Sequence, residues 1–99
     1  MNYFPEVIQV IPTTEHKVYI YFDDGTIRLF DAKEIITRGV FKPLQDVNIF
    51  IDTCTVINHT LAWSLDKSYS EETCLDIDPN TLYETCPVVE EAEELFNIS

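Results

Sequence analysis

The stretch from Cys74 to Cys86, CLDIDPNTLYETC, contains residue types that readily bind metal ions. Oxygen-bearing side chains alternate at Asp76, Asp78 and Asn80, which is the spacing of the first half of an EF-hand calcium loop. The stretch has three interpretations at this point: a metal site, a loop closed by a disulfide, or a strand that runs into a capped helix.

The calcium interpretation fails at the two positions that define the loop. An EF-hand needs a glycine at position 6 and a bidentate glutamate at position 12. Counted from Asp76, those positions hold Thr81 and Pro87. A helix start fits better, because Asp78 can accept hydrogen bonds from the first helical amides and Pro79 suits the first helical position. We therefore expect no metal and no cofactor.

The cysteines and histidines do not predict a zinc site either. The chain has three cysteines, Cys54, Cys74 and Cys86, and no Cys-x-x-Cys pair. An odd count without such a pair is atypical of a disulfide framework or a zinc knuckle. We expect free thiols and a cytoplasmic location, because the amino terminus lacks the basic and apolar blocks of a secretory signal. His16 and His59 are expected at solvated turns.

Catalysis by a cysteine and a histidine is the remaining chemical alternative. Cys54 and His59 would lie on one hairpin if the chain runs strand, turn, strand between them. A catalytic thiolate needs a base that a third group orients, and no motif supplies that group. We expect no catalytic residue and no enzyme. The alternative is a small-ligand or catalytic domain with a pocket near Trp63, Cys54 and His59.

The net charge of −12 is unevenly placed along the chain. Residues 1–60 hold eight acidic and five basic residues, whereas residues 61–99 hold ten acidic residues and only Lys67. Nucleic acids are bound chiefly by Lys and Arg, so we expect no direct nucleic-acid binding. No run approaches the roughly 18 apolar residues of a membrane span, so we expect no membrane association. The acidic half serves either solubility or attraction to a basic protein.

A central hairpin is the clearest local feature. Residues 17–23 alternate with a period of two, so Tyr19 and Tyr21 face away from the aliphatic side and must be exposed or covered. Asp24-Gly25 fits the two positive φ angles of a type I′ turn. Residues 26–30 then return as the partner strand.

The remaining pattern predicts a single α+β domain with a small antiparallel sheet and two or three short helices. Asp31 is expected to cap one helix and Gly39 to end it in the left-handed conformation. Further strands are expected over residues 7–11, 51–57, 61–65 and 75–77, and helical turns over 32–38, after Asp46, after Pro79 and over 88–96. Residues 1–87 would form the compact domain and 88–99 an acidic amphipathic C-terminal helix or tail.

Taken together, these elements resemble a small bacterial family known as domain of unknown function 2442. The resemblance extends over roughly residues 5–84 and depends on the order and spacing of several short motifs. These motifs are Phe22-Asp-Asp-Gly25, Phe30-Asp31, Gly39-Val-Phe41, Pro43-Leu44, Asp46, Phe50, Trp63, Asp76-Ile-Asp-Pro79 and Leu82-Tyr83. The chain departs from the family pattern between Trp63 and Asp76, where the link is longer, and beyond Tyr83.

The resemblance implies a compact α+β domain with an antiparallel sheet and no established activity. Some members carry an additional helix-turn-helix domain, for which we expect no room after residue 84 here. Many standalone members are encoded beside another small protein, in pairs suspected of being toxin–antitoxin modules.

We therefore expect a domain that acts through protein–protein contact, as an antitoxin-like or accessory partner of a neighbouring small basic protein. Self-association through the exposed hairpin, which would give a homo-oligomer, is a further alternative. The residues expected at the interface are Tyr19, Tyr21, Trp63, Glu90, Glu91 and Glu94.

Overall fold

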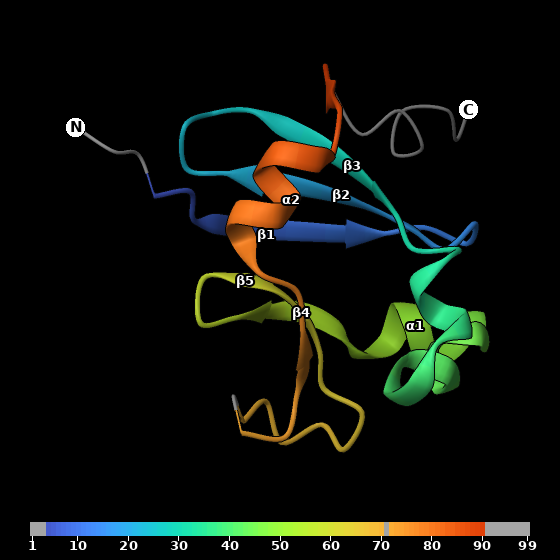
Figure 1. Cartoon of the computed structure of the whole chain (residues 1–99). Coiled ribbons are helices and arrows are strands. Elements are labelled where there is room, and N and C mark those ends of the chain that lie inside the picture. Colours follow the sequence, from blue (N-terminus) through green and yellow to red (C-terminus); the bar gives the residue numbers. More distant parts are fainter. Residues whose placement is uncertain (1–3, 71, 91–99) are drawn as a thin grey trace, which may run out of the picture.

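Two small antiparallel sheets form the frame of the computed structural model, which describes residues 4–70 and 72–90 (Figure 1). The first sheet has the order β1-β2-β3-β7 and the second the order β4-β5-β6. The strands are β1 (Val7–Pro12), β2 (Lys17–Phe22), β3 (Ile27–Asp31), β4 (Cys54–Ile57), β5 (Thr60–Trp63), β6 (Leu75–Asp76) and β7 (Val88–Val89). The helices are the 3₁₀ helices η1 (Ile35–Thr37) and η2 (Gly39–Gln45), and the α-helices α1 (Val47–Thr53) and α2 (Pro79–Thr85). The predicted α+β class is confirmed.

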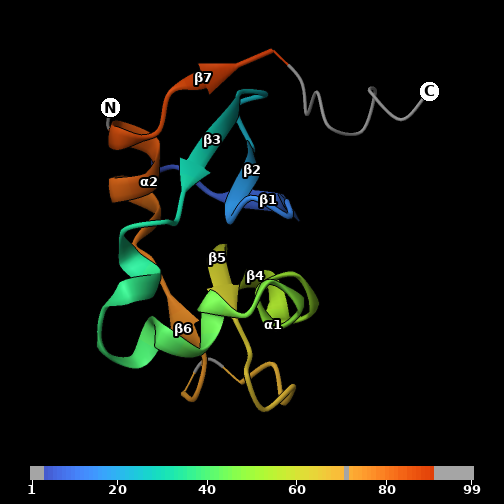
Figure 2. The ribbon, with the colours of Figure 1, turned by 90° about the vertical axis from the view of Figure 1, so that its right-hand side faces the viewer.

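The hydrophobic core lies between the two sheets and under the helices (Figures 1 and 2). Trp63 of β5 is fully buried, with its ring centre 5.6 Å from that of Phe50 in α1 and 6.3 Å from that of Phe41 in η2. Aromatic pairs at such separations add to the stabilisation that burial provides. Other large core side chains that are at most 1% exposed include Val7, Val18, Ile20, Phe22, Leu44, Leu61 and Leu82.

The hairpin of β2 and β3 is confirmed, but its predicted turn type is wrong. Tyr21 pairs with Ile27, and the Gly25 amide donates to the Phe22 carbonyl at 3.0 Å. Gly25 has a φ of +90°, whereas Asp24 lacks the positive φ that a type I′ turn needs. The connection is a three-residue loop, a type I turn followed by a left-handed glycine, which is the next most common hairpin geometry.

The type I′ geometry occurs instead in the hairpin of β4 and β5. Ile57 pairs with Thr60, so the loop has only two residues, Asn58 and His59. Their φ angles are +54° and +63°. A two-residue loop requires this conformation because its twist matches that of the flanking strands.

The strand expected over residues 51–57 is wrong in its first half, because α1 extends to Thr53. Asp46 starts α1 by accepting a hydrogen bond from the Asn48 amide at 2.9 Å, as expected of a capping residue. The helix then buries Phe50 and Thr53, and β4 begins at Cys54. Tertiary burial overrides the strand preference of the β-branched residues in this segment.

The chain before α1 forms two 3₁₀ helices, whereas only one helix, over residues 32–38, is expected there from the sequence. The helix expected over residues 32–38 is reduced to η1. The predicted cap is wrong, because Glu34 precedes η1, and Asp31 instead accepts a hydrogen bond from the Lys33 amide at 3.0 Å in the turn before it. Gly39 follows Arg38, the C-cap residue of η1, and has a φ of +46°, so the predicted left-handed conformation is confirmed; Gly39 is also the first residue of η2. The segment that follows is η2, with Pro43 inside it.

The junction before α2 is confirmed as a capped helix start. Asp78 accepts a hydrogen bond from the Thr81 amide at 3.1 Å, and Pro79 is the first helical residue. The opening run of alternating oxygens is therefore a structural cap.

The helix expected from Val88 is wrong at its first two residues. Val88 and Val89 form β7, which pairs with Arg28 and Ile27 at the edge of the first sheet. The Leu29 amide donates a hydrogen bond to the Pro87 carbonyl at 3.0 Å, which holds the residue before β7 beside β3. The rest of the expected helix, residues 91–99, lies outside the described residues.

Candidate functional site

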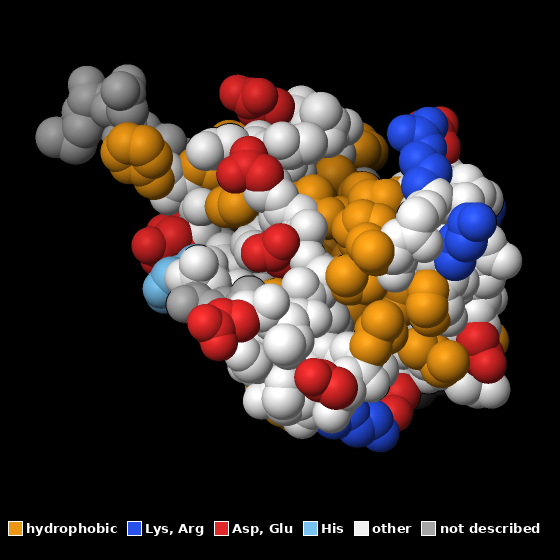
Figure 3. Space-filling view, turned by 60° about the horizontal axis from the view of Figure 1, so that its bottom comes forward, with side chains coloured by type: hydrophobic (Ala, Val, Ile, Leu, Met, Phe, Trp, Pro, Cys, Tyr) orange, Lys and Arg blue, Asp and Glu red, His pale blue; other side chains and the backbone are white. Residues whose placement is uncertain are grey.

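One face of the molecule combines exposed apolar side chains with Lys and Arg side chains (Figure 3). Apolar side chains gather on one half of this face and Lys and Arg side chains border them, while several carboxylates occupy the other half. Val40 in η2 is 66% exposed, and Ile49 in α1 and Leu65 after β5 are 37% and 38% exposed. Exposed apolar areas of this kind often mark interaction sites.

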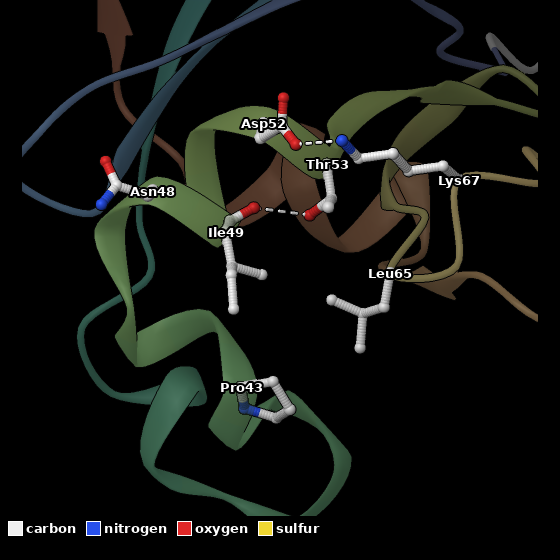
Figure 4. Close-up of a pocket in the computed structure, with 7 residues that line it drawn as sticks. All are labelled: Pro43, Asn48, Ile49, Asp52, Thr53, Leu65 and Lys67. Carbon is white, nitrogen blue, oxygen red and sulfur yellow. Dashed lines mark hydrogen bonds and ion pairs between the residues drawn. The ribbon is translucent and has the colours of Figure 1, made fainter.

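An open groove of about 530 Å³ lies between η2, α1 and the turn after β5 (Figure 4). We call it the α1–η2 groove. Ile49 points into it from α1, Leu65 faces Ile49 from the other wall, and Pro43 of η2 lies across the gap from both (Figure 4). The full lining is Pro43, Asn48, Ile49, Asp52, Thr53, Leu65 and Lys67.

The helical period of α1 supplies one wall of the groove. Asn48, Ile49, Asp52 and Thr53 follow the spacing of a single helix face. The Thr53 hydroxyl donates to the Ile49 carbonyl at 2.7 Å, so this polar group is satisfied within the helix and does not point at a ligand. The wall therefore presents an apolar centre at Ile49 with polar groups at its ends.

An ion pair closes one end of the groove. Lys67 Nζ lies 2.5 Å from Asp52 Oδ2, and the two side chains are 57% and 61% exposed. The hydrogen bond and the charge of Asp52 raise the pKa of Lys67, which stays protonated. Solvent screens such an exposed pair, so its contribution to stability is small. The ion pair fixes the positions of the Lys67 ammonium and the Asp52 carboxylate at the rim of the groove.

The aromatic residues predicted at an interface lie mostly inside the protein. Trp63 is fully buried between Cys54 and Leu75 on neighbouring strands, so its predicted place at an interface is wrong. Tyr19 is only 7% exposed, so its predicted place at an interface is also wrong. Tyr21 is half-buried and keeps some accessible surface.

The acidic residues predicted at an interface are only partly described. Glu90 follows β7 and is exposed. Glu91 and Glu94 lie outside the described residues.

The α1–η2 groove was not expected from the sequence, because part of α1 was assigned to a strand. The signal that could have found it is the Asp46 cap, which places Ile49 and Asp52 on one helix face.

Cys54 and His59 stand at opposite ends of the β4–β5 hairpin. Cys54 pairs with Trp63 at the end far from the turn, and His59 is in the turn itself. Burial raises the pKa of the Cys54 thiol to about 12, so the thiol is neutral near pH 7 and a poor nucleophile. Neither residue lines the α1–η2 groove or the second cavity, at Leu29, Phe30 and Pro87.

The structure describes residues 4–70 and 72–90, and two findings apply to this part of the chain. Over these ranges no three His, Cys, Asp or Glu side chains are grouped so that they could hold a metal ion. Among the helices in the same part of the chain, none has both the length and the apolar character needed to cross a membrane.

The comparison with known families gives one match, and it covers most of the chain. A family model described as a protein of unknown function (DUF2442) matches residues 7–88. The match runs from the first residue of β1 to the first residue of β7 and so includes both sheets, all the described helices and the α1–η2 groove. No curated protein and no solved structure matches. The chain belongs to the DUF2442 family.

Proposed function

We propose that this protein is a non-catalytic domain that binds another protein through the α1–η2 groove. The observation that carries the proposal is the pair Ile49 and Leu65, two large apolar side chains that face each other across an open groove and remain more than a third exposed. Covering such a pair removes apolar surface from water, which drives association. The polar groups beside them, Asn48 and the Asp52–Lys67 pair, can orient a partner.

We propose further that the partner is a small basic protein and that this domain is its antitoxin-like or accessory partner in the cytoplasm. The net charge of −12 supports a basic partner. The β6–α2 segment contributes to the acidic surface through exposed carboxylates at Asp76, Asp78 and Glu84. Opposite charges accelerate encounter and suppress wrong partners, and this effect weakens as salt rises.

Co-expression with the product of the neighbouring gene tests this proposal. The tagged protein is purified at low salt, and the amount of the neighbour that co-purifies is measured. An Ile49→Asp variant places a charge in the groove and should abolish co-purification. Ile51→Asp is the matched control, because Ile51 is also 37% exposed in α1 but does not line the groove.

Two results would overturn the proposal. If the unmodified pair fails to co-purify at low salt, the neighbouring protein is not the partner. If Ile49→Asp and Ile51→Asp both retain the neighbour, the groove is not the contact surface. Circular dichroism of each variant shows whether the fold is intact.

A further inference from the structure

The α1–η2 groove is bordered by positive charge in a chain that has little of it. The chain has only six Lys and Arg residues against eighteen Asp and Glu. Three of the six belong to the groove or to η2: Lys67 in the lining, Lys42 beside Pro43, and Arg38 at the start of η2. Lys67 is paired with Asp52 and Arg38 with Glu34. Lys42 is exposed and forms no ion pair with any residue that the structure describes. A ligand that is apolar in its centre and acidic at its flanks fits this surface.

The chain itself contains a segment of this composition directly after β7. The segment from Glu90 to Ile98 reads EEAEELFNI, with four glutamates and with Leu95, Phe96 and Ile98 as its large apolar residues. Short amphipathic segments commonly dock with two or three apolar anchors in a groove and with charged groups outside. Its charge and its apolar anchors complement the groove.

We propose that residues 90–98 of a second copy of this chain occupy the α1–η2 groove. Leu95 and Phe96 cover Ile49 and Leu65, and the glutamates face Lys42 and Lys67. The inference rests on the proposed function in one respect, that the groove binds protein. Because both occupants would cover Ile49 and Leu65, the segment of the second copy and the basic neighbour compete for the groove.

A second copy fits the geometry better than the chain's own segment. In both ribbon views β7 ends on the side of the molecule away from α1 and η2 (Figures 1 and 2). Leu95 lies five residues beyond Glu90, and five extended residues reach at most about 18 Å. Even the shortest dimension of the molecule is 23 Å. Two chains that exchange this segment form a closed dimer with two identical contacts, the commonest symmetry of homo-oligomers.

The mass of the full-length protein in solution is the first test. Light scattering coupled to size exclusion should give a dimer for the natural chain. It should give monomers for Ile49→Asp, whose groove is blocked, and for the double variant Leu95→Ser with Phe96→Ser, whose segment has lost its anchors. The controls Ile51→Asp and Asn97→Ala should remain dimers. A monomeric natural chain, or a dimer that survives both blocking variants, overturns the proposal.

Mixing the two blocked variants gives the sharper result. Ile49→Asp keeps an intact segment and the Leu95→Ser, Phe96→Ser variant keeps an intact groove, so the mixture should form a heterodimer with one contact although each variant alone is monomeric. A labelled peptide of residues 88–99 should bind the Leu95→Ser, Phe96→Ser variant, and Ile49→Asp added to that variant should weaken binding by at least about tenfold. No heterodimer and no peptide binding overturn the inference. If the natural chain still co-purifies with the basic neighbour and Ile49→Asp does not, the proposed function stands although the inference has failed.

Discussion

The guanidinium carbon of Arg28 lies 3.9 Å from the centre of the Tyr83 ring, and this stack joins β3 to α2. Arg28 Nη1 also donates to the carbonyl oxygens of Tyr83 at 2.7 Å and Cys86 at 3.2 Å. The Tyr83 hydroxyl in turn donates to Asp24 Oδ2 at 2.6 Å. Carbonyls at the end of a helix lack partners within it, so a cation there satisfies them. One arginine therefore holds the last turn of α2 against the first sheet.

Replacing Arg28 with lysine should destabilise the protein although the charge is kept. Lysine cannot stack its head group flat on a ring or span two carbonyls with a planar fork. We expect a loss of about 1–2 kcal/mol in the free energy of unfolding, measured by urea denaturation. Lys33→Ala, which removes an exposed cation from the η1 region, is the control and should change stability little. Equal stability of Arg28→Lys and the natural protein would show that the stack and the fork do not matter.

The hydrogen bond between Tyr83 and Asp24 should make stability depend on pH at both ends of the scale. Hydrogen bonds from the Thr26 side chain and from Tyr83 lower the pKa of Asp24. A lowered folded-state pKa gives stability that is present above the unfolded value of about 4 and is lost as pH falls through the folded value. The same contact with Asp24 raises the pKa of Tyr83, so its contribution is present below about pH 10 and is lost as pH rises through the folded value.

A Tyr83→Phe variant separates this contact from the ring packing. Phenylalanine keeps the stack on Arg28 and the edge contact with Phe22, whose ring centre lies 5.1 Å from that of Tyr83. Urea midpoints measured from about pH 3 to pH 11 should differ most between the two proteins in the middle of the range and converge at both ends. A difference that stays constant with pH would contradict the assignment of the two pKa shifts to this hydrogen bond.

The elements that the sequence predicts correctly are those fixed by nearby residues. The Asp78 cap with Pro79 and the left-handed Gly39 each depend on contacts within a few positions, and each is found as expected. The turn type predicted at Gly25 is wrong because it was inferred from the pair Asp24-Gly25 alone. The length of the loop depends on the register of the two strands, which this pair does not determine.

The features that the sequence does not predict depend on distant contacts. β7 exists because Val88 and Val89 meet β3, some sixty residues earlier in the chain, and α1 extends to Thr53 because Phe50 packs on Trp63. The α1–η2 groove needs three separate segments in place before it forms, so no local pattern indicates it. Trp63 illustrates the same limit for function, since an aromatic residue suited to an interface is equally suited to the core.

His59→Gly should stabilise the protein. His59 has a φ of +63° in the two-residue turn of the second sheet, a conformation that costs a non-glycine residue about 1–2 kcal/mol. The substitution creates Asn58-Gly, the pair that type I′ turns prefer. Glycine loses more entropy on folding, by roughly 0.5–1 kcal/mol, so we expect a net gain of under about 1 kcal/mol.

Thermal denaturation measures this gain, with Asn58→Ala as the contrasting variant that should destabilise the turn.

The His59→Gly variant also tests the alternative of a functional pocket near His59. Co-purification with the basic neighbour should be unchanged in His59→Gly, since His59 lies outside the α1–η2 groove. A more stable protein that has lost its partner would place His59 in the binding surface.

Cys54 should resist alkylation in the folded protein although it is not in a disulfide. Burial raises the pKa of its thiol to about 12, so almost no thiolate is present near pH 8. Iodoacetamide treatment followed by peptide mass spectrometry should find Cys54 unmodified in buffer and modified in urea. The raised pKa also means that stability is present below the ordinary thiol value and is lost as pH rises from about 9 toward 12. A Cys54→Ala variant should remove this alkaline component, and rapid alkylation of Cys54 in the native state would instead indicate an accessible thiolate and favour the catalytic alternative.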